Sequence, residues 1–225
     1  MEKDTHLLPS QIIRECTSVV HEVCTLSGPS HAEEVSLGVP TTVVVASPNM
    51  TLNRKVQEVI SSSAFRAYSN SDILGVEIAG AVKNVISVAS GMCAGLGFGD
   101  NTTAALVTRG LNEIVRLSKK LGAEESTFYG LAGIGDLCVT AFSKYSRNRQ
   151  FGVEVGKGKS PRDVLEKMGM IVEGYYTVES LYHMMVEMDV DMPISKSVYQ
   201  ILYEKLSPRQ AILDLMSRDL THENN

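Results

Sequence analysis

Several features that would assign this chain to a common functional class are missing from its 225 residues. It has no tryptophan, and its formal net charge of −5 at pH 7 argues against a nucleic-acid partner, because such partners favour a basic surface. The four cysteines form no C-x-x-C pair, and with the five histidines they match no known zinc-ligand spacing. We therefore expect neither a nucleic-acid partner nor a metal site.

The glycine pattern for binding a dinucleotide is also absent. No G-x-G-x-x-G follows a strand and opens a helix, which is the arrangement that receives the pyrophosphate. Gly91, Gly95, Gly97 and Gly99 instead separate two predicted helices, so we interpret them as a turn between packed helices. The chain thus carries no dinucleotide fingerprint of its own.

A targeting segment and a membrane span are not expected either. The start, MEKDTHLLPS, has neither a basic region before an apolar core nor an Arg-rich amphipathic pattern. The longest apolar stretch, residues 73–98, is interrupted by Glu77 and Lys83, and ionised groups are costly near a bilayer centre. This stretch is predicted to be a buried helix of a soluble, cytoplasmic protein.

What the sequence does contain changes in character near residue 70. Before it, short elements alternate: a predicted helix (9–24), a strand TTVVVAS (41–47), a helix (52–61) and a strand (64–69). The continuous apolarity of TTVVVAS is typical of a strand buried on both faces of a sheet. Two strands with helices between them indicate the trailing edge of an α/β sheet whose earlier strands are absent.

After this point helix signals dominate. Ser71 is predicted to cap a long helix, and Asp100 or Asn101 the next one. Ser160 and Ser207 each precede a proline, which suits the first position of a helix. We place the domain boundary near Ser71.

Lys83 is the most informative residue, because it lies in the middle of GVEIAGAVKNVISVASG, a helix that is apolar nearly all round. Among its neighbours one turn away, Ala79, Gly80 and Ser87 are small and leave room for a ligand. Burial disfavours the charged form of a lysine and so lowers its pKa, towards the range in which the amine can exchange protons. The alternative is that the stem lies along the helix and the amine reaches solvent. Asn84 follows directly and can point at a neighbouring volume.

The segment AGIGDLCVT (132–140) combines two glycines with an acidic residue. Asp136 is predicted to begin a short helix, with Thr140 one turn later on the same face. Aspartate is also favoured at helix N-termini, so a plain helix cap is the competing interpretation of Asp136.

Basic residues gather in SKYSRNRQFG (143–152), where Lys144, Arg147 and Arg149 surround Ser146 and Asn148 without helical apolar spacing. Such a run is usually a solvated loop. A guanidinium flanked by hydroxyl and amide groups is, however, the chemistry that a phosphate needs, because it offers paired donors.

The segment LSGPSHAEEV contains a small-residue turn. Gly28 and Pro29 predict the turn, and Ser30 is predicted to open a helix. Backbone amides at such a helix start can meet an anion or a carbonyl, although a plain capped turn has the same pattern.

These segments together resemble the NAD(P)-dependent glycerol-3-phosphate dehydrogenases of the bacterial type. The matches follow the family order and span nearly the whole chain: LSGPSHAEEVSLGVPTTVVVAS, GVEIAGAVKNVISVASGMCAGLGFGDNTTAALVTRGLNEI, LAGIGDLCVTAFSKYSRNRQFG, IVEGYYTV and PISKSVYQILYEKLSP. The resemblance implies an α+β, mostly α fold. Residues 1–70 would be the trailing part of a Rossmann NAD(P)-binding domain, and residues 71–225 an all-helical substrate domain similar to that of 6-phosphogluconate dehydrogenase.

The resemblance implies reversible reduction of dihydroxyacetone phosphate to sn-glycerol 3-phosphate with NAD or NADP as cofactor, which supplies phospholipid synthesis. It makes Lys83 the proton donor and acceptor at the C2 oxygen, with Asn84 holding that oxygen or the nicotinamide side. It has Asp136 and Thr140 orient the glycerol moiety and the lysine. The substrate contacts implied are Gly28, Ser30, Lys83, Asp136, Ser146, Arg147 and Asn148. The cofactor contacts implied are Ala32, Arg147, Ile171 and Glu173.

The chain departs from the family at its start. Members open with a Rossmann domain that carries the glycine fingerprint, so roughly 100 residues, about one small domain, would be missing. Lys3 does not align with the substrate-contacting lysine of the family. We therefore expect a truncated product or an incomplete gene model with weak or no activity, and the residue that selects NAD or NADP would lie in the missing part.

Two other interpretations stay open at this point. One is another hydroxyacid dehydrogenase that joins a Rossmann domain to an all-helical domain, since these also use a helix lysine near an asparagine. The other is a non-catalytic helical module for binding or assembly. A homodimer formed through the exposed sheet edge is compatible with either, because unpaired edges invite association.

Overall fold

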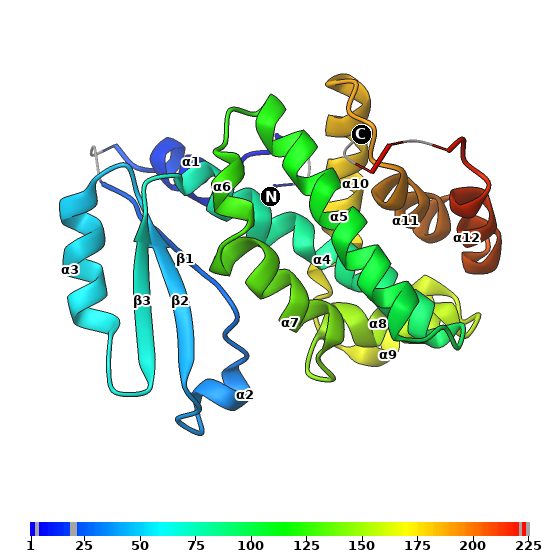
Figure 1. Ribbon diagram of the computed structural model, residues 1–225, viewed down its shortest axis with the longest axis horizontal. Helices are drawn as coiled ribbons and strands as arrows, with labels where there is room; N and C mark the ends of the chain where they lie inside the picture. Colours follow the sequence, from blue (N-terminus) through cyan, green and yellow to red (C-terminus); the bar gives the residue numbers. More distant parts are fainter. Residues whose placement is uncertain (3–4, 19–21, 221, 224–225) are drawn as a thin grey trace.

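The computed structural model describes residues 1–2, 5–18, 22–220 and 222–223 of the chain, so that Lys3 lies outside the described residues. A small sheet forms one end of the molecule, and helices packed around a central helix form the rest (Figure 1). The predicted fold, mostly α with a remnant of an α/β sheet, is confirmed.

The sheet has the strand order β1-β2-β3. The strand β2 (Thr41–Ala46) pairs antiparallel with β1 (Thr25–Ser27) and parallel with β3 (Phe65–Asn70). The buried strand predicted from TTVVVAS is confirmed, since its side chains pack on two different sides: Val44 and Ala46 join Val76 of the helical part, while Val43 and Val45 form a second cluster with Ala67. Both faces of the sheet are therefore covered at β2.

The segment before β2 differs from the prediction. The helix expected over residues 9–24 ends at Cys16, and β1 was not predicted because three residues are too few for a periodic pattern. The helix expected to open at Ser30 is a single turn that begins at Ala32. The helices before β2 are α1 (Pro9–Cys16) and α2 (Ala32–Val35), and α3 (Met50–Ile60) lies between β2 and β3 in the sequence.

The helix α4 (Ile73–Gly95) is the axis of the helical part. It is long and apolar enough to cross a membrane by length and composition alone, yet 72% of its most apolar window is buried inside the protein, as predicted. Its cap is Asp72 and not the predicted Ser71, because the Asp72 carboxylate accepts the Gly75 N–H at 2.8 Å. The same carboxylate accepts the Glu124 N–H at 2.9 Å and the Thr127 hydroxyl at 2.8 Å.

Most of the remaining helices pack on α4 (Figure 1): α5 (Asp100–Lys120), α6 (Glu125–Phe128), the irregular turn η1 (Leu131–Gly135), α7 (Asp136–Phe142), α8 (Arg147–Gly156), α10 (Glu173–Glu187) and α11 (Pro193–Tyr203). The helix α9 (Pro161–Met168) packs on α8, and α12 (Pro208–Met216) packs on α11. The helix α5 is preceded by Gly99 and not capped by Asp100 or Asn101 as predicted. Ser207 caps α12 as predicted, whereas the Ser160 side chain makes no cap hydrogen bond.

The helices α4 and α8 approach each other closely through glycines. A methyl group added at Gly91 would lie 2.9 Å from the Cα of Gly152 and would overlap the carbonyl of Arg149. Gly95 and Gly156 make a second contact of the same kind one turn further along. The two helix backbones are thus in direct contact, and the distance between them is fixed by the absence of side chains.

Candidate active site

A polar cavity of about 160 Å³ lies where the loop after β1 meets α4, α7 and the start of α8. Every residue that the sequence predicted as catalytic or substrate-binding lines it. The full lining is Gly28, Ser30, His31, Lys83, Asn84, Asp136, Val139, Thr140, Tyr145, Ser146, Arg147 and Asn148. Segments separated by more than a hundred residues of sequence are therefore brought to one volume.

An ion pair between Lys83 and Asp136 forms one end of the polar cavity. The side chain of Lys83 is 19% exposed and that of Asp136 is 5% exposed, so the amine does not reach out along the helix surface to solvent. Asp136 is also not the cap of α7, because it is the first helical residue and its carboxylate faces the lysine. The Thr140 hydroxyl lies 2.6 Å from the Asp136 carbonyl and 3.3 Å from its carboxylate, which ties this residue to the pair.

Two asparagines continue the polar lining away from the ion pair. The Asn148 amide donates to Oδ1 of Asn84 at 2.9 Å, while the Asn84 amide donates to the Gly80 carbonyl at 3.2 Å. Oδ1 of Asn148 in turn accepts the Gly174 N–H at 2.8 Å, at the start of α10. These bonds fix both amide groups and connect α4, α8 and α10 at the cavity.

The basic segment at residues 143–152, whose ordinary interpretation is a solvated loop, instead runs into α8. Ser146 is buried, and its hydroxyl caps α8 by accepting the Arg149 N–H at 3.2 Å. The same hydroxyl lies 3.0 Å from the hydroxyl of Ser87. Arg147 is exposed at the cavity wall. The N-terminus of a helix and a guanidinium therefore face one volume, an arrangement that suits an anion.

Gly28 shapes the part of the cavity wall that the loop after β1 contributes. Its φ of +134° lies in a region that favours glycine, and a methyl group there would lie 3.0 Å from the Cα of Val43. The turn therefore lies directly on β2. The Ser30 hydroxyl donates to the Gly28 carbonyl at 3.0 Å and holds the turn in this shape.

A second cavity of about 310 Å³, the side cavity, adjoins the polar cavity and shares Lys83 and Asn84 with it. Its other lining residues are Met1 and residues of β1, α1, α4 and α10, among them Glu173. Ala32 and Ile171, the other two residues expected only at the cofactor, are exposed and line neither cavity.

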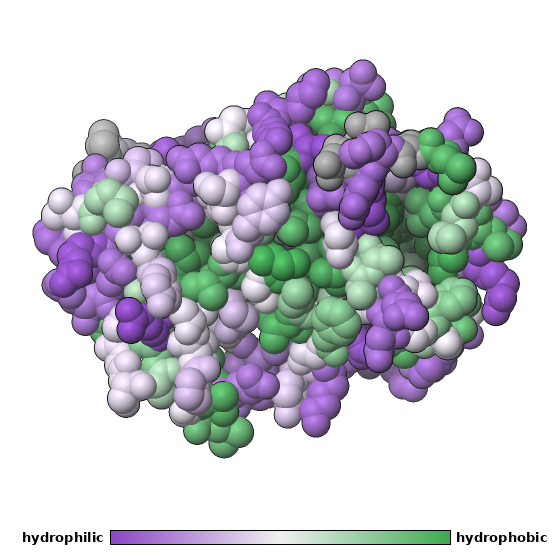
Figure 2. Space-filling view, in the orientation of Figure 1, coloured by the Kyte–Doolittle hydropathy of each residue, from purple (hydrophilic) through white to green (hydrophobic). Residues whose placement is uncertain are grey.

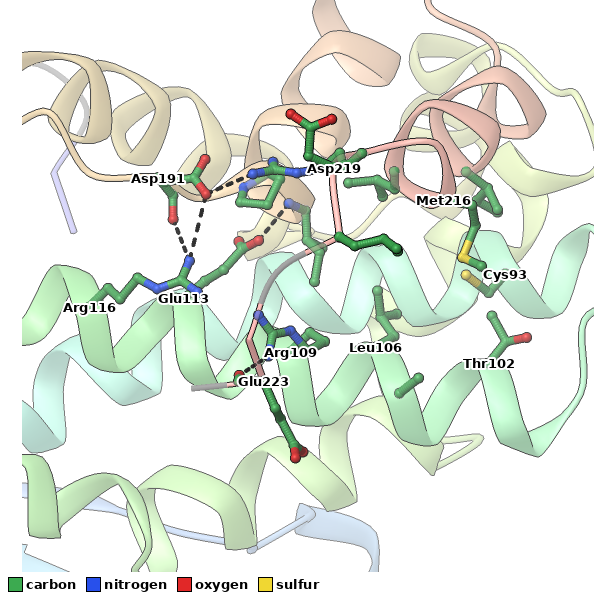
Figure 3. A pocket seen from close by; sticks show the side chains of 17 residues that line it. Cys93, Thr102, Leu106, Arg109, Glu113, Arg116, Asp191, Met216, Asp219 and Glu223 are labelled. Atoms are coloured by element: carbon green, nitrogen blue, oxygen red, sulfur yellow. Dashed lines mark hydrogen bonds and ion pairs between the residues drawn. The ribbon is translucent and has the colours of Figure 1, made fainter. Parts of the chain in front are cut away.

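A larger cavity of about 510 Å³ lies among α5, α11, α12 and the tail that follows (Figure 3). It contains none of the predicted residues. Two of its arginines bind one aspartate, since Arg116 donates to the Asp191 carbonyl at 2.8 Å and Arg218 to the Asp191 carboxylate at 2.9 Å. Exposed apolar side chains gather around α12 beside it (Figure 2). We therefore place the candidate site in the polar cavity, which is smaller but is lined by every residue predicted as catalytic or substrate-binding.

A buried carboxylate borders this larger cavity and joins two helices. Glu113 of α5 accepts the Ile194 N–H at 2.6 Å and the Ser195 N–H at 3.0 Å, at the start of α11. Burial raises the pKa of Glu113 to about 7, against the lowering effect of these hydrogen bonds and of Arg116. Its role is to cap α11 (Figure 3).

Three residues of the polar cavity were not predicted: His31, Val139 and Tyr145. His31 directly follows the turn at Gly28, and Tyr145 directly precedes the predicted cluster at Ser146. Both could therefore have been suspected from their closeness in sequence to predicted residues. Val139 is apolar, and nothing in the sequence indicates that it lines the site.

Comparison with known proteins identifies the family. The sequence model described as "NAD-dependent glycerol-3-phosphate dehydrogenase C-terminus" matches residues 72–213, and the corresponding N-terminus model matches residues 1–53. The chain belongs to this family.

Curated relatives and a solved structure agree with this assignment. The chain is 54% identical to a glycerol-3-phosphate dehydrogenase [NAD(P)+] of Pelodictyon phaeoclathratiforme, over 91% of the chain and 61% of the relative. It is 48% identical to that of Clostridium acetobutylicum, over 99% of the chain and 67% of the relative. The crystal structure of glycerol-3-phosphate dehydrogenase from Coxiella burnetii superposes with a TM-score of 0.84 at 39% identity, covering 87% of this chain and 60% of that one. The chain thus spans about three fifths to two thirds of the proteins it matches.

Proposed function

We propose that this protein is an oxidoreductase that interconverts dihydroxyacetone phosphate and sn-glycerol 3-phosphate with NAD or NADP, and so supplies glycerol 3-phosphate for phospholipid synthesis. The observation that carries the proposal is the polar cavity, in which the Lys83–Asp136 pair faces the same volume as Arg147 and the start of α8. One end offers a proton and the other binds an anion, which matches a small phosphoester with a carbinol group.

At the anionic end, Arg147 and the first amides of α8 would receive the phosphate. The side chains of Ser146 and Asn148 already have protein partners, so their contribution would be to hold the helix start in place. A phosphate bound there would neutralise the exposed guanidinium of Arg147.

At the other end, Lys83 would give a proton to the C2 oxygen during reduction and take it back during oxidation. Asp136 holds the ammonium in position through the ion pair, and Thr140 holds Asp136. Asn84 lines the same two cavities as Lys83, and its side chain is fixed by Asn148, so it would bind the same oxygen or the cofactor beside it.

The side cavity would hold the reactive end of the cofactor, which supplies or accepts the hydride when bound. A methyl group added at Gly80 would meet only the Ser27 hydroxyl, at 3.4 Å, so this wall of α4 leaves space for a flat ring beside Lys83. We also assign Glu173, which lines the side cavity, as a contact of the cofactor. Arg147 would also be shared with the cofactor, and Ala32 and Ile171 would contact it only at its outer parts, because both are exposed.

The proposal extends to organisation and setting. We assign residues 1–70 to the cofactor-binding unit and residues 71–225 to the substrate unit, because the chain passes from the sheet into α4 at Asp72. We also propose a cytoplasmic location, which suits a buried α4. A homodimer is part of the proposal as well, and light scattering on the purified chain would detect it. A hydroxyacid dehydrogenase with another substrate is the second candidate, supported by the lysine-asparagine pair alone.

The test is to measure substrate binding and turnover by the 225-residue chain. Isothermal titration should give saturable binding of sn-glycerol 3-phosphate that Arg147→Ala weakens strongly. Where dihydroxyacetone phosphate drives oxidation of NADH, Lys83→Met should lower turnover by about 10²-fold or more, the usual contribution of a general acid. Faster turnover of 3-hydroxy acids than of dihydroxyacetone phosphate would favour the second candidate, and equal binding by wild type and Arg147→Ala would refute the phosphate site.

A further inference from the structure

His31 belongs to the polar cavity but has no role in the mechanism given above. It follows the turn at Gly28 and reaches the cavity from the segment between β1 and α2. The residue as a whole is partly exposed. Its place in the lining of the cavity makes it a candidate for contact with whatever occupies the cavity.

The imidazole of His31 has an unused polar atom. Its Nε2 is shielded from solvent and has no hydrogen-bond partner among the described residues. A buried polar atom without a partner is unfavourable, and in native proteins such an atom usually finds a ligand or a water molecule. Because His31 lines a polar cavity, the missing partner of Nε2 is best supplied by a molecule bound there.

Tyr145 fixes the orientation of this imidazole. The two rings meet edge to face, with centroids 6.1 Å apart and an interplanar angle of 64°. The amine of Lys144 lies 5.2 Å from the centroid of the Tyr145 ring. The ring of His31 therefore packs on the segment that directly precedes Ser146 and Arg147, at the anionic end of the cavity and not at the ion pair.

We propose that His31 is a further substrate-binding residue, which donates a hydrogen bond from Nε2 to a phosphoryl oxygen of the bound phosphoester. This inference rests on the proposed function, because it needs the phosphate to lie at the start of α8. The phosphate is then held by Arg147 of α8 and by His31, which belongs to the loop after β1. Tyr145 is the positioning residue, since it acts through the His31 ring.

Three variants separate the hydrogen bond from the packing. His31→Phe keeps an aromatic ring against Tyr145 but removes the donor. His31→Gln places an amide nitrogen near the position of Nε2 and so restores the donor without the ring. His183→Phe is the matched control, because His183 is exposed on α10 and lines none of the cavities described above.

The measurement is the dissociation constant of sn-glycerol 3-phosphate for the 225-residue chain, by isothermal titration without cofactor. His31→Phe should raise it about tenfold, the size expected when one hydrogen bond to a charged oxygen is lost. His31→Gln should restore most of the affinity, and His183→Phe should change nothing. In wild type, the 15N resonance of the His31 side chain should shift on titration with glycerol 3-phosphate and stay unchanged with glycerol.

The outcomes distinguish this proposal from the one it rests on. Affinity that Arg147→Ala lowers but His31→Phe leaves at the wild-type value overturns the role of His31 alone. Affinity that His31→Gln lowers as much as His31→Phe also overturns it, because the donor would then not be the cause. Wild-type chain that binds neither glycerol 3-phosphate nor inorganic phosphate overturns both proposals.

Discussion

The close contact between α4 and α8 makes a prediction that links packing to the site. Gly91→Ala adds one methyl group where α8 leaves no room, whereas Gly80→Ala adds the same group to the same helix facing only the Ser27 hydroxyl at 3.4 Å. Both changes bring the same intrinsic gain of about 1 kcal/mol from replacing a helical glycine by alanine. The difference between the two variants therefore isolates the cost of the clash.

The size of that cost follows from the distances. The new methyl carbon at Gly91 would lie 2.9 Å from the Cα of Gly152, and ordinary contacts of this kind begin at 3.4 Å, so the helices must separate by at least the difference of 0.5 Å. Overlap with the Arg149 carbonyl demands more. Overpacking of this kind costs about 1–3 kcal/mol. In a protein of this size, about 2 kcal/mol corresponds to a melting temperature about 4–8 °C lower for Gly91→Ala than for Gly80→Ala.

The same displacement should reach the site, because the amides and Arg147 at the start of α8 would move away from Lys83. A misplacement of about 1 Å can cost a factor of about 10² in a reaction rate that depends on such a geometry. The affinity for a ligand that contacts both ends of the cavity should fall as well. Thermal melting followed by circular dichroism and titration with sn-glycerol 3-phosphate measure the two effects on the same samples. Melting temperatures that coincide for the two variants, or full affinity in Gly91→Ala, would show that the glycine contact does not set the spacing.

Two buried carboxylates give further predictions. Asp72→Ala removes the acceptor of the Gly75 and Glu124 amides and of a threonine hydroxyl, so urea unfolding should show a loss of about 2–4 kcal/mol; a loss below about 0.5 kcal/mol would contradict it. Glu113 has a pKa raised from 4.5 to about 7, so the folded state binds its proton more tightly than the unfolded chain. That stability is present below pH 4.5 and is lost as pH rises through 7, by up to about 3 kcal/mol, which wild type should show between pH 5 and 8 and Glu113→Gln should not.

Much of the fold could be predicted because its elements are long or strongly patterned. The 23-residue α4 and the buried β2 both give continuous apolar signals, and the helix starts at Pro161 and Pro208 follow their serines. The errors fall on short or locally ambiguous pieces. β1 has three residues, and the cap of α4 moved by one position because aspartate and serine are adjacent and both accept amide hydrogens.

Sequence reasoning named most of the residues that line the polar cavity, but it did not give their hydrogen-bond and ion-pair partners. Lys83 and Asp136 were each assigned a role, but their ion pair was not predicted. The two residues are 53 positions apart in the sequence, and a local sequence pattern cannot show that they meet. The interpretation of Asp136 as a plain cap was wrong because tertiary contact decided where its carboxylate points. His31 was missed because the feature that draws attention to it is a nitrogen without a hydrogen-bond partner, and only the folded structure shows that feature.

The rigidity of the site depends on two serines of α4 that count for little in a sequence. The hydroxyl of Ser87 donates to the Thr140 carbonyl and that of Ser90 to the Ala141 carbonyl, each at 2.7 Å. These are carbonyls of the last turn of α7, which the helix itself cannot satisfy. By binding them, α4 fixes the end of the helix that begins with Asp136. Since Ser87 also contacts Ser146, one hydroxyl couples the position of α7, which carries Asp136, with that of the start of α8.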